Sequence, residues 1–301
     1  MISVWYNQDS PSDTIIRGEQ ITMDIKLAAL DLDGTLYNDR KEITPHTMSV
    51  LEKASAHGIE IIPATGRPFF GTPGNIRSLG FVNYILTCNG AAVYNRRSEE
   101  CLFEHTMPCK LSAELLTELD KLHICIDVFI NGIPYHQSDN LPIVDEISVN
   151  STMKEYIRTS RTLVDNIAQM VEKDSLGVQK ITLNFVRRGE SLIDREKTYD
   201  LLRRYSEIDV VSGGDRNYEI TMKGVNKGSA LLRLGEMLGA KPCEIMAIGD
   251  SENDLSMIQS AGVGVAMANS DECLLRAAGY TTLSNEEDGA AYAIEKYALG
   301  M

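Results

Sequence analysis

Two carboxylates two positions apart, Asp31 and Asp33, follow an apolar run and precede Gly34 and Thr35. The run Leu27 to Leu30 does not alternate with polar residues, which is typical of a strand covered on both faces in a parallel sheet. Glycine lets the chain turn sharply after such a strand. The stretch therefore predicts a compact group of oxygen atoms at the edge of a sheet, suited to a hard cation such as Mg²⁺.

This stretch has two alternative interpretations. An EF-hand calcium loop needs oxygen ligands at positions 1, 3 and 5, glycine at 6 and glutamate at 12. Here Gly34 comes at the fourth position and a strand precedes it, so that loop is excluded. Alternatively, Asp31 and Asp33 only form a turn after a core strand, and a short motif cannot exclude this by itself. The rest of the chain decides between a site and a turn.

Two further predicted strands also end in polar residues. The strand expected at residues 59–64 runs into Thr65-Gly66-Arg67, and the strand expected at 244–248 runs into Gly249-Asp250-Ser251-Glu252-Asn253-Asp254. Because strand–helix–strand crossovers are right-handed, Thr65 is expected beside Asp31 at the same sheet edge. Its hydroxyl and the backbone N–H groups freed by Gly66 could hold phosphate oxygens.

These residue types match the parts of phosphoryl transfer through an aspartyl phosphate. Asp31 would attack phosphorus and Asp33 would exchange a proton with the leaving oxygen. A metal would let the anionic Asp31 approach an anionic phosphate. Lys227, at a predicted helix start, would neutralise charge on the equatorial oxygens. Asp250 would complete the oxygen shell of the cation, and Asn253 would offer an amide donor to the phosphate.

Four short motifs of the chain resemble those of the haloacid dehalogenase (HAD) superfamily: Asp31-Leu32-Asp33-Gly34-Thr35, Thr65-Gly66-Arg67, Lys227-Gly228 and Gly249-Asp250-Ser251-Glu252-Asn253-Asp254. More narrowly, Asn89-Gly90-Ala91, the α/β insert after the second motif and Gly224-Val225-Asn226-Lys227-Gly228 resemble the Cof-type phosphatases, which carry a type IIB α/β cap. The resemblance covers about residues 23 to 301. It implies an α/β fold, with a Rossmann-like doubly wound parallel sheet core and an inserted α/β cap domain.

The resemblance also implies roles for single residues. Asp31 becomes the nucleophile and Asp33 the general acid/base. The implied Mg²⁺ ligands are Asp31, the carbonyl of Asp33, and Asp250. The residues implied to hold the transferring phosphate are Thr65, Lys227 and Asn253, with Gly66 freeing backbone N–H groups. Asp254 is expected to steady either Lys227 or the metal shell.

Three residues have more than one interpretation. Arg67 could contact the substrate just beyond the phosphate, or it could be a solvated charge at a helix start. Asn89, at a strand end that faces the cap, has a similar pair of interpretations. Glu219, in the strand that returns from the cap, is expected to anchor the hinge rather than touch the substrate.

A chain of 301 residues is longer than one compact core usually needs, so two domains are expected. The expected division is an N-terminal extension at 1–22, a catalytic core at 23–108 and 213–301, and an inserted cap at 109–212. The hinge back into the core is expected at Ser212 to Asp215, which assigns the strand at 218–221 to the core. Within the cap, the pattern predicts strands at 124–130, 133–135, 180–186 and 208–211, helices near 113–122, 163–171 and 191–204, and irregular sequence up to about residue 160.

The composition of the chain limits the classes of molecule that it is expected to bind. The chain has 43 acidic and 29 basic residues and a net charge of -14, which disfavours general binding of nucleic acid or anionic membranes. Its six cysteines show no metal-site spacing and are expected to be reduced and mostly buried. No apolar run approaches a membrane span and no signal segment is recognised, so cytoplasm is the expected location. The expected partner is a small phosphorylated metabolite, with the protein a monomer or weak homo-oligomer.

Alternative functions use the same residues. A phosphomutase would return the phosphoryl group to its substrate. Thr65 comes only 34 positions after Asp31, and a crossover helix fills this interval, so there is no room for the helical cap of such an enzyme. A sugar-phosphate-sensing or partner-binding protein would have lost catalysis, which an intact set of acidic residues and lysine disfavours. A serine hydrolase is disfavoured because Asn253 stands where its motif has a second glycine. Sugar phosphates are the first substrate class to consider, and pyridoxal phosphate or flavin mononucleotide the next.

Overall fold

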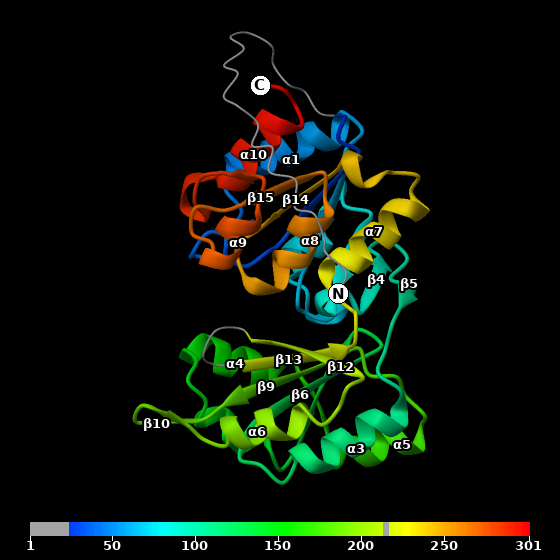
Figure 1. Ribbon diagram of the computed structural model, residues 1–301, viewed down its shortest axis with the longest axis vertical. Helices are drawn as coiled ribbons and strands as arrows, with labels where there is room; N and C mark the ends of the chain where they lie inside the picture. Colours follow the sequence, from blue (N-terminus) through cyan, green and yellow to red (C-terminus); the bar gives the residue numbers. More distant parts are fainter. Residues whose placement is uncertain (1–23, 213–216) are drawn as a thin grey trace, which may run out of the picture.

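The computed structural model describes residues 24–212 and 217–301. The extension predicted at 1–22 and the predicted hinge residues Gly213 to Asp215 lie outside these ranges. The described chain forms two parts, which lie one above the other in Figure 1. The upper part, called the core below, is built on a five-stranded sheet, and the lower part, called the cap, on a six-stranded sheet.

Every pairing in the five-stranded core sheet is parallel. From one edge to the other, its strands are β16 (Tyr280–Thr281), β15 (Val263–Ala266), β14 (Ile245–Gly249), β1 (Leu27–Leu30) and β2 (Glu60–Pro63). The helices of the core are α1 (Pro45–Ala56), α2 (Gly74–Arg77), α7 (Lys227–Met237), α8 (Leu255–Ser260), α9 (Glu272–Ala277) and α10 (Gly289–Tyr297). In Figure 1, α1 and α10 lie on one side of the sheet and α7 and α8 on the other, which is the expected doubly wound arrangement.

Strand β1 is apolar throughout because each of its faces packs on a different layer of helices. Ala28 and Leu30 belong to the hydrophobic cluster that includes residues of α1 and α10. Leu27 and Ala29 belong to the cluster that includes residues of α7 and α8. All four side chains are buried. Burial on both faces fixes β1 in the middle of the sheet, and so fixes the place where Asp31 leaves it.

A second, three-stranded sheet extends the core. Strand β3 (Tyr84–Thr87) pairs antiparallel with β4 (Ala92–Asn95), which pairs antiparallel with β5 (Cys101–Glu104). The strands β4 and β5 therefore form a hairpin. A single parallel bridge between Ala64 and Leu86 connects β3 to the end of β2, so β3 continues the order of the main sheet.

The cap sheet has the strand order β12 (Ile208–Ser212), β13 (Asn217–Met222), β9 (Lys180–Phe185), β6 (Ile124–Ile130), β7 (Ile133–Gln137) and β8 (Thr162–Val164). Its larger helices are α3 (Cys109–Leu119), α4 (Ser151–Ser160), α5 (Ile167–Lys173) and α6 (Arg195–Leu202). Figure 1 shows α3, α5 and α6 on the face turned away from the core. The predicted strands at 124–130 and 133–135 pair antiparallel as β6 and β7, and Asn131 and Gly132, both with positive φ (51° and 76°), form the tight turn between them.

Strand β13 corrects the predicted return to the core. It pairs antiparallel with β12 and β9, so it belongs to the cap sheet rather than to the core. The predicted core boundary at residue 213 is therefore wrong. The glycines after Ser212 suggested a domain boundary, but β12, which ends at Ser212, and β13, which begins at Asn217, are neighbouring strands of one sheet. The chain enters the core only after Met222, through residues 223–226 and into α7.

Several local predictions for the cap also differ. Helix α4 forms where irregular sequence was expected, and Asn150 caps it by accepting a hydrogen bond from the backbone N–H of Met153. The helix predicted at 163–171 begins at Ile167, because residues 162–164 form the edge strand β8. The helix predicted at 191–204 begins at Arg195, after the small hairpin of β10 (Arg187–Arg188) and β11 (Ser191–Leu192). Within residues 24–212 and 217–301, the short 3-10 segments are Phe69–Gly71, Cys88–Gly90, Leu141–Asp145, Pro242–Glu244, Glu252–Asp254 and Asn285–Glu287.

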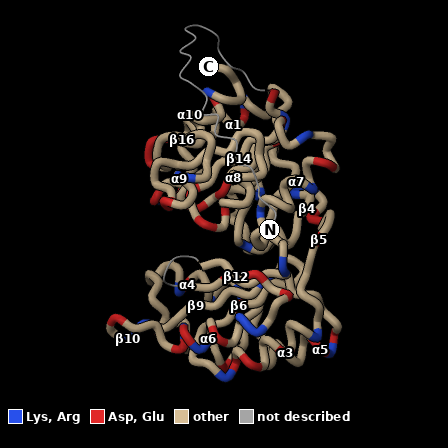
Figure 2. The backbone as a smooth tube through the Cα atoms, viewed as in Figure 1, with Lys and Arg blue, Asp and Glu red and all other residues tan. Residues whose placement is uncertain are grey.

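The surface agrees in part with the compositional predictions. Figure 2 shows acidic and basic positions in both the core and the cap. Cys101, Cys243 and Cys273 are exposed, so the expectation that the cysteines are mostly buried is wrong. Among the helices of the described residues, none has both the length and the apolar character needed to cross a bilayer.

Candidate active site

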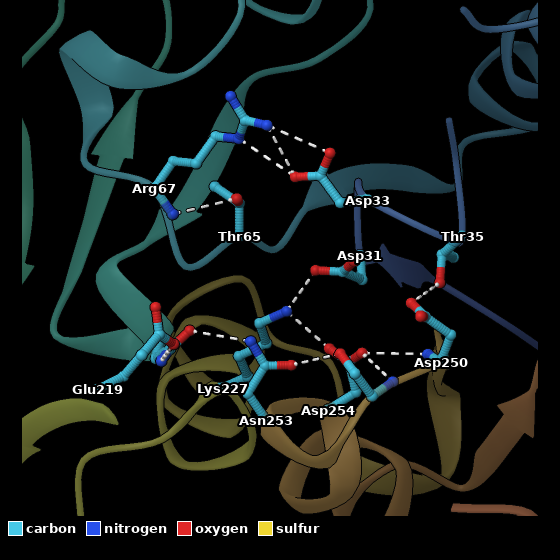
Figure 3. A network of polar contacts seen from close by, with 12 residues as sticks. Asp31, Asp33, Thr35, Thr65, Arg67, Glu219, Lys227, Asp250, Asn253 and Asp254 are labelled. Carbon is cyan, nitrogen blue, oxygen red and sulfur yellow. Dashed lines mark hydrogen bonds and ion pairs between the residues drawn. The ribbon is translucent and has the colours of Figure 1, made fainter. Parts of the chain in front are cut away.

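The ends of three adjacent core strands bring the predicted residues together. Asp31 follows β1, Thr65 follows β2 and Asp250 follows β14, and β1 lies between the other two. Lys227, at the start of α7, reaches the same place, with its Nζ 2.5 Å from Oδ1 of Asp31 and 2.6 Å from Oδ1 of Asp254 (Figure 3). The predicted convergence of these side chains at one sheet edge is therefore observed.

Lys227 is fully buried between two carboxylates. Its place is fixed by a capping box, in which Asn226 accepts from the backbone N–H of Ser229 and Ser229 Oγ accepts from the backbone N–H of Asn226. Burial alone would lower the pKa of Lys227, but Asp254 and Asp31 outweigh it and raise that pKa. Lys227 is therefore a fixed positive charge against Asp31.

Three carboxylates crowd around this lysine. Oxygen atoms of Asp31, Asp250 and Asp254 all lie within 4.8 Å of one another. Burial, and after it the neighbouring Asp254, raise the pKa of Asp250 to about 7. Burial also raises the pKa of Asp31 well above its usual range, although Lys227 opposes this. The charge of one lysine does not balance three carboxylates, so a divalent cation with a preference for oxygen ligands fits this cluster.

The hydrogen bonds of Asp254 differ from those of Asp250. Asp254 is used fully by the protein, because its Oδ1 faces Lys227 and its Oδ2 accepts from the backbone N–H groups of Asp250 and Ser251, both at 3.1 Å. Asp250 accepts from Thr35 Oγ1 at 2.9 Å through Oδ1. The contacts of Asp254 thus favour the first of its two expected roles, that of steadying Lys227.

Gly34 is required where β1 turns into this cluster. It has φ +89°, and a Cβ placed on it would lie 2.5 Å from Oδ2 of Asp250. A side chain would therefore collide with Asp250 as well as strain the backbone. This confirms the expectation that Gly34 allows a sharp turn.

Asp33 points away from the acidic cluster and lies in ion pairs (Figure 3). Arg67 Nη2 lies 2.9 Å from its Oδ2 and Arg67 Nε lies 3.2 Å from the same atom, while Lys41 Nζ lies 2.8 Å from its Oδ1. Burial opposes the effect, but Arg67 and Lys41 together lower the pKa of Asp33. Arg67 is therefore a partner of Asp33 and not a solvated charge.

The remaining predicted residues form a chain of contacts across the site. Asn253 Nδ2 donates to Oδ1 of Asn89 at 3.3 Å, and Asn89 Nδ2 donates to Glu219 at 2.6 Å. Thr65 Oγ1 accepts from the backbone N–H of Arg67 at 3.2 Å. Asn89 thus joins the core loop that carries Asn253 to strand β13 of the cap.

A family model described as a haloacid dehalogenase-like hydrolase matches residues 28–294. This chain is a haloacid dehalogenase-like hydrolase. The match covers the cap as well as both segments of the core. It also agrees with the four motifs, whose residues occupy one edge of the core sheet.

Individual relatives agree with the family. The phosphatase YwpJ of Bacillus subtilis (strain 168) is 29% identical, with 89% of this chain and 98% of that protein covered. The 5-amino-6-(5-phospho-D-ribitylamino)uracil phosphatase YcsE of the same organism is 28% identical, with 92% and 97% covered. A solved structure of a haloacid dehalogenase-like hydrolase from B. subtilis has a TM-score of 0.78 at 27% identity, with 90% and 99% covered. These matches confirm the expected family, the α/β core with a cap, and the expected enzyme class, the phosphoric monoester hydrolases.

In this hydrolase a cavity of about 360 Å³ lies between the core and the cap. The predicted residues that line it from the core are Asp31, Asp33, Thr65, Gly66, Arg67 and Asn253. Asn89 is not among the lining residues. Glu219, which was expected only to anchor the hinge, does line the cavity, and its Oε1 lies 2.5 Å from Lys180 Nζ.

Residues of the cap that line the cavity were not found from the sequence. Asp127 interrupts the apolar strand β6, and Lys180 begins the apolar strand β9. A charged residue within an otherwise apolar strand is the sequence feature that could have identified both. Arg161 and Tyr156 come from α4 and its end, a segment that was expected to be irregular. The hydroxyl of Tyr156 donates to the carbonyl of Gly71 at 3.0 Å, so α4 contacts the core directly.

A buried group of charges stabilises the cap side of this hydrolase. Asp127 Oδ1 lies 2.9 Å from Nδ1 of His136 and its Oδ2 accepts from Nη2 of Arg161 at 2.8 Å, with side-chain exposures of 1%, 0% and 8%. Burial raises the pKa of Asp127, but Arg161 and His136 outweigh it and lower that pKa. The ionised form of Asp127 is therefore favoured in the folded protein.

Asp127→Asn is expected to lower the free energy of unfolding at neutral pH by about 3–5 kcal/mol, because it leaves the buried Arg161 without its carboxylate. A lowered pKa stabilises the fold above the unfolded pKa, near 4, and this contribution disappears as pH falls through the folded value. The difference from wild type should therefore shrink in urea titrations below about pH 4. The exposed Asp174→Asn at the end of α5 serves as control. A constant difference across this range would contradict the assignment.

Proposed function

We propose that this hydrolase is a Mg²⁺-dependent phosphatase that acts on a small phosphorylated metabolite, a sugar phosphate or a phosphorylated cofactor, through an aspartyl phosphate on Asp31. The observation that carries the proposal is the placement of Asp31 against the buried Lys227 and beside Asp250, at the wall of a cavity closed by the cap. A carboxylate held in this way faces incoming phosphate with a fixed cation next to it.

The metal would be held by Asp31, Asp250 and the main-chain carbonyl of Asp33. When bound, it supplies positive charge that neutralises the phosphate oxygens. The Asp31 carboxylate forms a bond to phosphorus as the bond to the leaving oxygen breaks, and water later attacks the same phosphorus to release phosphate and regenerate Asp31. Lys227 stabilises the negative charge that gathers on the equatorial oxygens in both steps.

Asp33 would move the proton in both steps. It gives a proton to the leaving oxygen and takes one from the attacking water. The ion pairs with Arg67 and Lys41 favour its ionised form, which suits the second step. For the first step Asp33 must be protonated, so we infer that the substrate phosphate draws Arg67 away from it. Arginine pairs readily with phosphate, which makes this exchange of partners favourable.

The phosphate would be bound by Thr65 Oγ1, the backbone N–H after Gly66, and the amide of Asn253. All three residues line the cavity near Asp31. The cap would cover the substrate, and we place its limits at residues 109–222 because β13 pairs within the cap sheet. The YcsE relative, by its name, acts on a phosphate ester of a ribityl chain. A substrate with a similarly small leaving group is consistent with a cavity of about 360 Å³.

The test is a panel of phosphorylated metabolites, incubated with purified protein and Mg²⁺. Release of inorganic phosphate from at least one ester supports the proposal, whereas an isomerised product without phosphate release would identify a phosphomutase. No Mg²⁺-dependent turnover across the panel would instead support a sensing or binding protein.

Mg²⁺ is also expected to stabilise the folded protein, because a ligand that binds only the folded state raises its melting temperature. Addition of Mg²⁺ should raise the melting temperature of the wild type and EDTA should reverse it. Asp250→Asn should lose most of this rise, whereas the exposed Asp24→Asn should keep it. An equal rise in Asp250→Asn would contradict the role of Asp250 as a ligand.

A further inference from the structure

Three buried polar atoms on the cap side of the cavity have no hydrogen-bond partner in the part of the chain that the structure describes. They are Nε of Arg161, Oγ1 of Thr182 and Oδ1 of Asn217. All three side chains line the same cavity. The Arg161 side chain and the Thr182 residue are each only 8% exposed. Since buried polar atoms are nearly always hydrogen-bonded, a ligand in the cavity is the natural partner for these atoms.

The three atoms come from separate elements that the fold holds in place. Arg161 ends α4, with its guanidinium bonded to Asp127 and lying 5.1 Å from the ring centre of Tyr156. Thr182 lies in β9 and Asn217 in β13, which are neighbouring strands. The positions of these groups are therefore set before any ligand arrives, which lowers the entropic cost of binding one.

The residues that line the cavity from the cap are called the cap wall below. The positive and negative charges of their side chains balance one another. The two cations of the cap wall are each paired with a carboxylate, Arg161 with Asp127 at 2.8 Å and Lys180 with Glu219 at 2.5 Å. The pKa of Glu219 is lowered, because Lys180 and Asn89 outweigh the effect of burial, so its ionised form is favoured. Thus the wall presents no unpaired cation to a second anionic group on the substrate.

We propose that Arg161, Thr182 and Asn217 form the subsite that recognises the leaving group, and that this subsite selects an uncharged leaving group with hydroxyls over one that carries a second phosphate. The inference rests on the proposed phosphatase function and specifies its substrate.

The hydrogen-bonding character of the three atoms is the reason for this selectivity. Nε of Arg161 only donates, Oδ1 of Asn217 only accepts, and Oγ1 of Thr182 does both. A hydroxyl both donates and accepts, so adjacent hydroxyls can satisfy all three atoms. A phosphate dianion only accepts, so it would leave Asn217 Oδ1 unsatisfied and would be buried without a free cation, which is costly.

The test compares kcat/KM for hydroxylated esters with kcat/KM for para-nitrophenyl phosphate, whose leaving group has no aliphatic hydroxyls. Glucose 6-phosphate, ribitol 5-phosphate and fructose 6-phosphate are the hydroxylated probes, and fructose 1,6-bisphosphate carries the second anion. The variants Thr182→Val and Asn217→Leu each remove one polar atom at nearly constant size. Thr162→Val, on the exposed edge strand β8 of the same sheet, is the matched control.

For the preferred hydroxylated ester, each of the two variants should lower the ratio to para-nitrophenyl phosphate by about three- to tenfold, the effect of one lost hydrogen bond. The control should leave the ratio unchanged. Fructose 6-phosphate should be preferred to fructose 1,6-bisphosphate by at least about tenfold, because of the buried unpaired charge. Unchanged ratios in both variants would overturn the subsite, and equal or faster hydrolysis of the bisphosphate would overturn the selection against a second anion.

Failure of the proposed function gives a different result. In that case no ester is hydrolysed, para-nitrophenyl phosphate included. Calorimetric affinities of wild type, Thr182→Val and Thr162→Val for glucose 6-phosphate then decide the subsite. Weaker binding by Thr182→Val alone supports it, and equal binding by all three proteins overturns it.

Discussion

Replacing Asp31 by asparagine is expected to remove turnover while the fold stays intact. An amide has nearly the shape of the carboxylate, so its oxygen can still accept the hydrogen bond from Lys227. It cannot form the phosphoryl intermediate, and loss of a nucleophile lowers the rate by more than about 10⁴-fold. Stability should change little, because Lys227 keeps its contact with Asp254 at 2.6 Å.

Phosphate release at saturating substrate measures the first effect, and thermal unfolding followed by circular dichroism measures the second. Asp24→Asn changes an exposed aspartate just before β1 and should match wild type in both assays. If Asp31→Asn kept more than a small fraction of the wild-type rate, Asp31 would not be the nucleophile.

Lys227→Ala is expected to lower both activity and stability. Removing a preorganised cation from a buried site lowers kcat/KM by about 10²–10³-fold. The same change leaves Asp31 and Asp254 buried without their cation, which costs about 3–5 kcal/mol of unfolding free energy. An activity loss by itself would thus be ambiguous, because unfolding could also cause it.

A double variant separates the two effects. Lys227→Ala with Asp254→Asn removes the lysine together with one of its two buried carboxylate partners, so it should regain part of the lost stability. It should not regain kcat/KM, because the cation next to the phosphate is still missing. The exposed Lys173→Ala, at the end of α5, is the matched control. A folded Lys227→Ala protein with wild-type kcat/KM would show that Lys227 does not stabilise the transition state.

The core and its site could be predicted because their sequence patterns, apolar strands that end in polar motifs, are local and strong. An apolar strand such as β1 can only be buried on both faces, and its polar end must then lie at the sheet edge. Parallel neighbours place their carboxyl ends together, which brings Asp31, Thr65 and Asp250 to one edge. The four motifs therefore determined most of the site before any side-chain geometry was known.

The cap-side wall could not be predicted in the same way. All seven residues of β6 are buried. The sequence of this strand therefore lacks the alternation of apolar and polar residues that would distinguish its two faces. Ile124, Ile126 and Val128 pack in the cap cluster, whereas Asp127 and Phe129 line the cavity. Apart from Asp127 the strand is apolar because its second face is covered too, by cap residues around Cys125 and by core residues around Phe129. That cover depends on contacts between distant parts of the chain.

The contacts that run from Lys180 through Glu219 and Asn89 to Asn253 have a consequence for the evolution of this enzyme. They tie the strands that would recognise the leaving group to the loop that would bind the phosphate. A substitution at Lys180 that changed substrate preference would therefore also disturb phosphate binding. Thr182 and Asn217 take no part in this chain of contacts, so substitutions there should change substrate preference without disturbing phosphate binding. Related enzymes with different substrates should therefore differ mainly at these two positions.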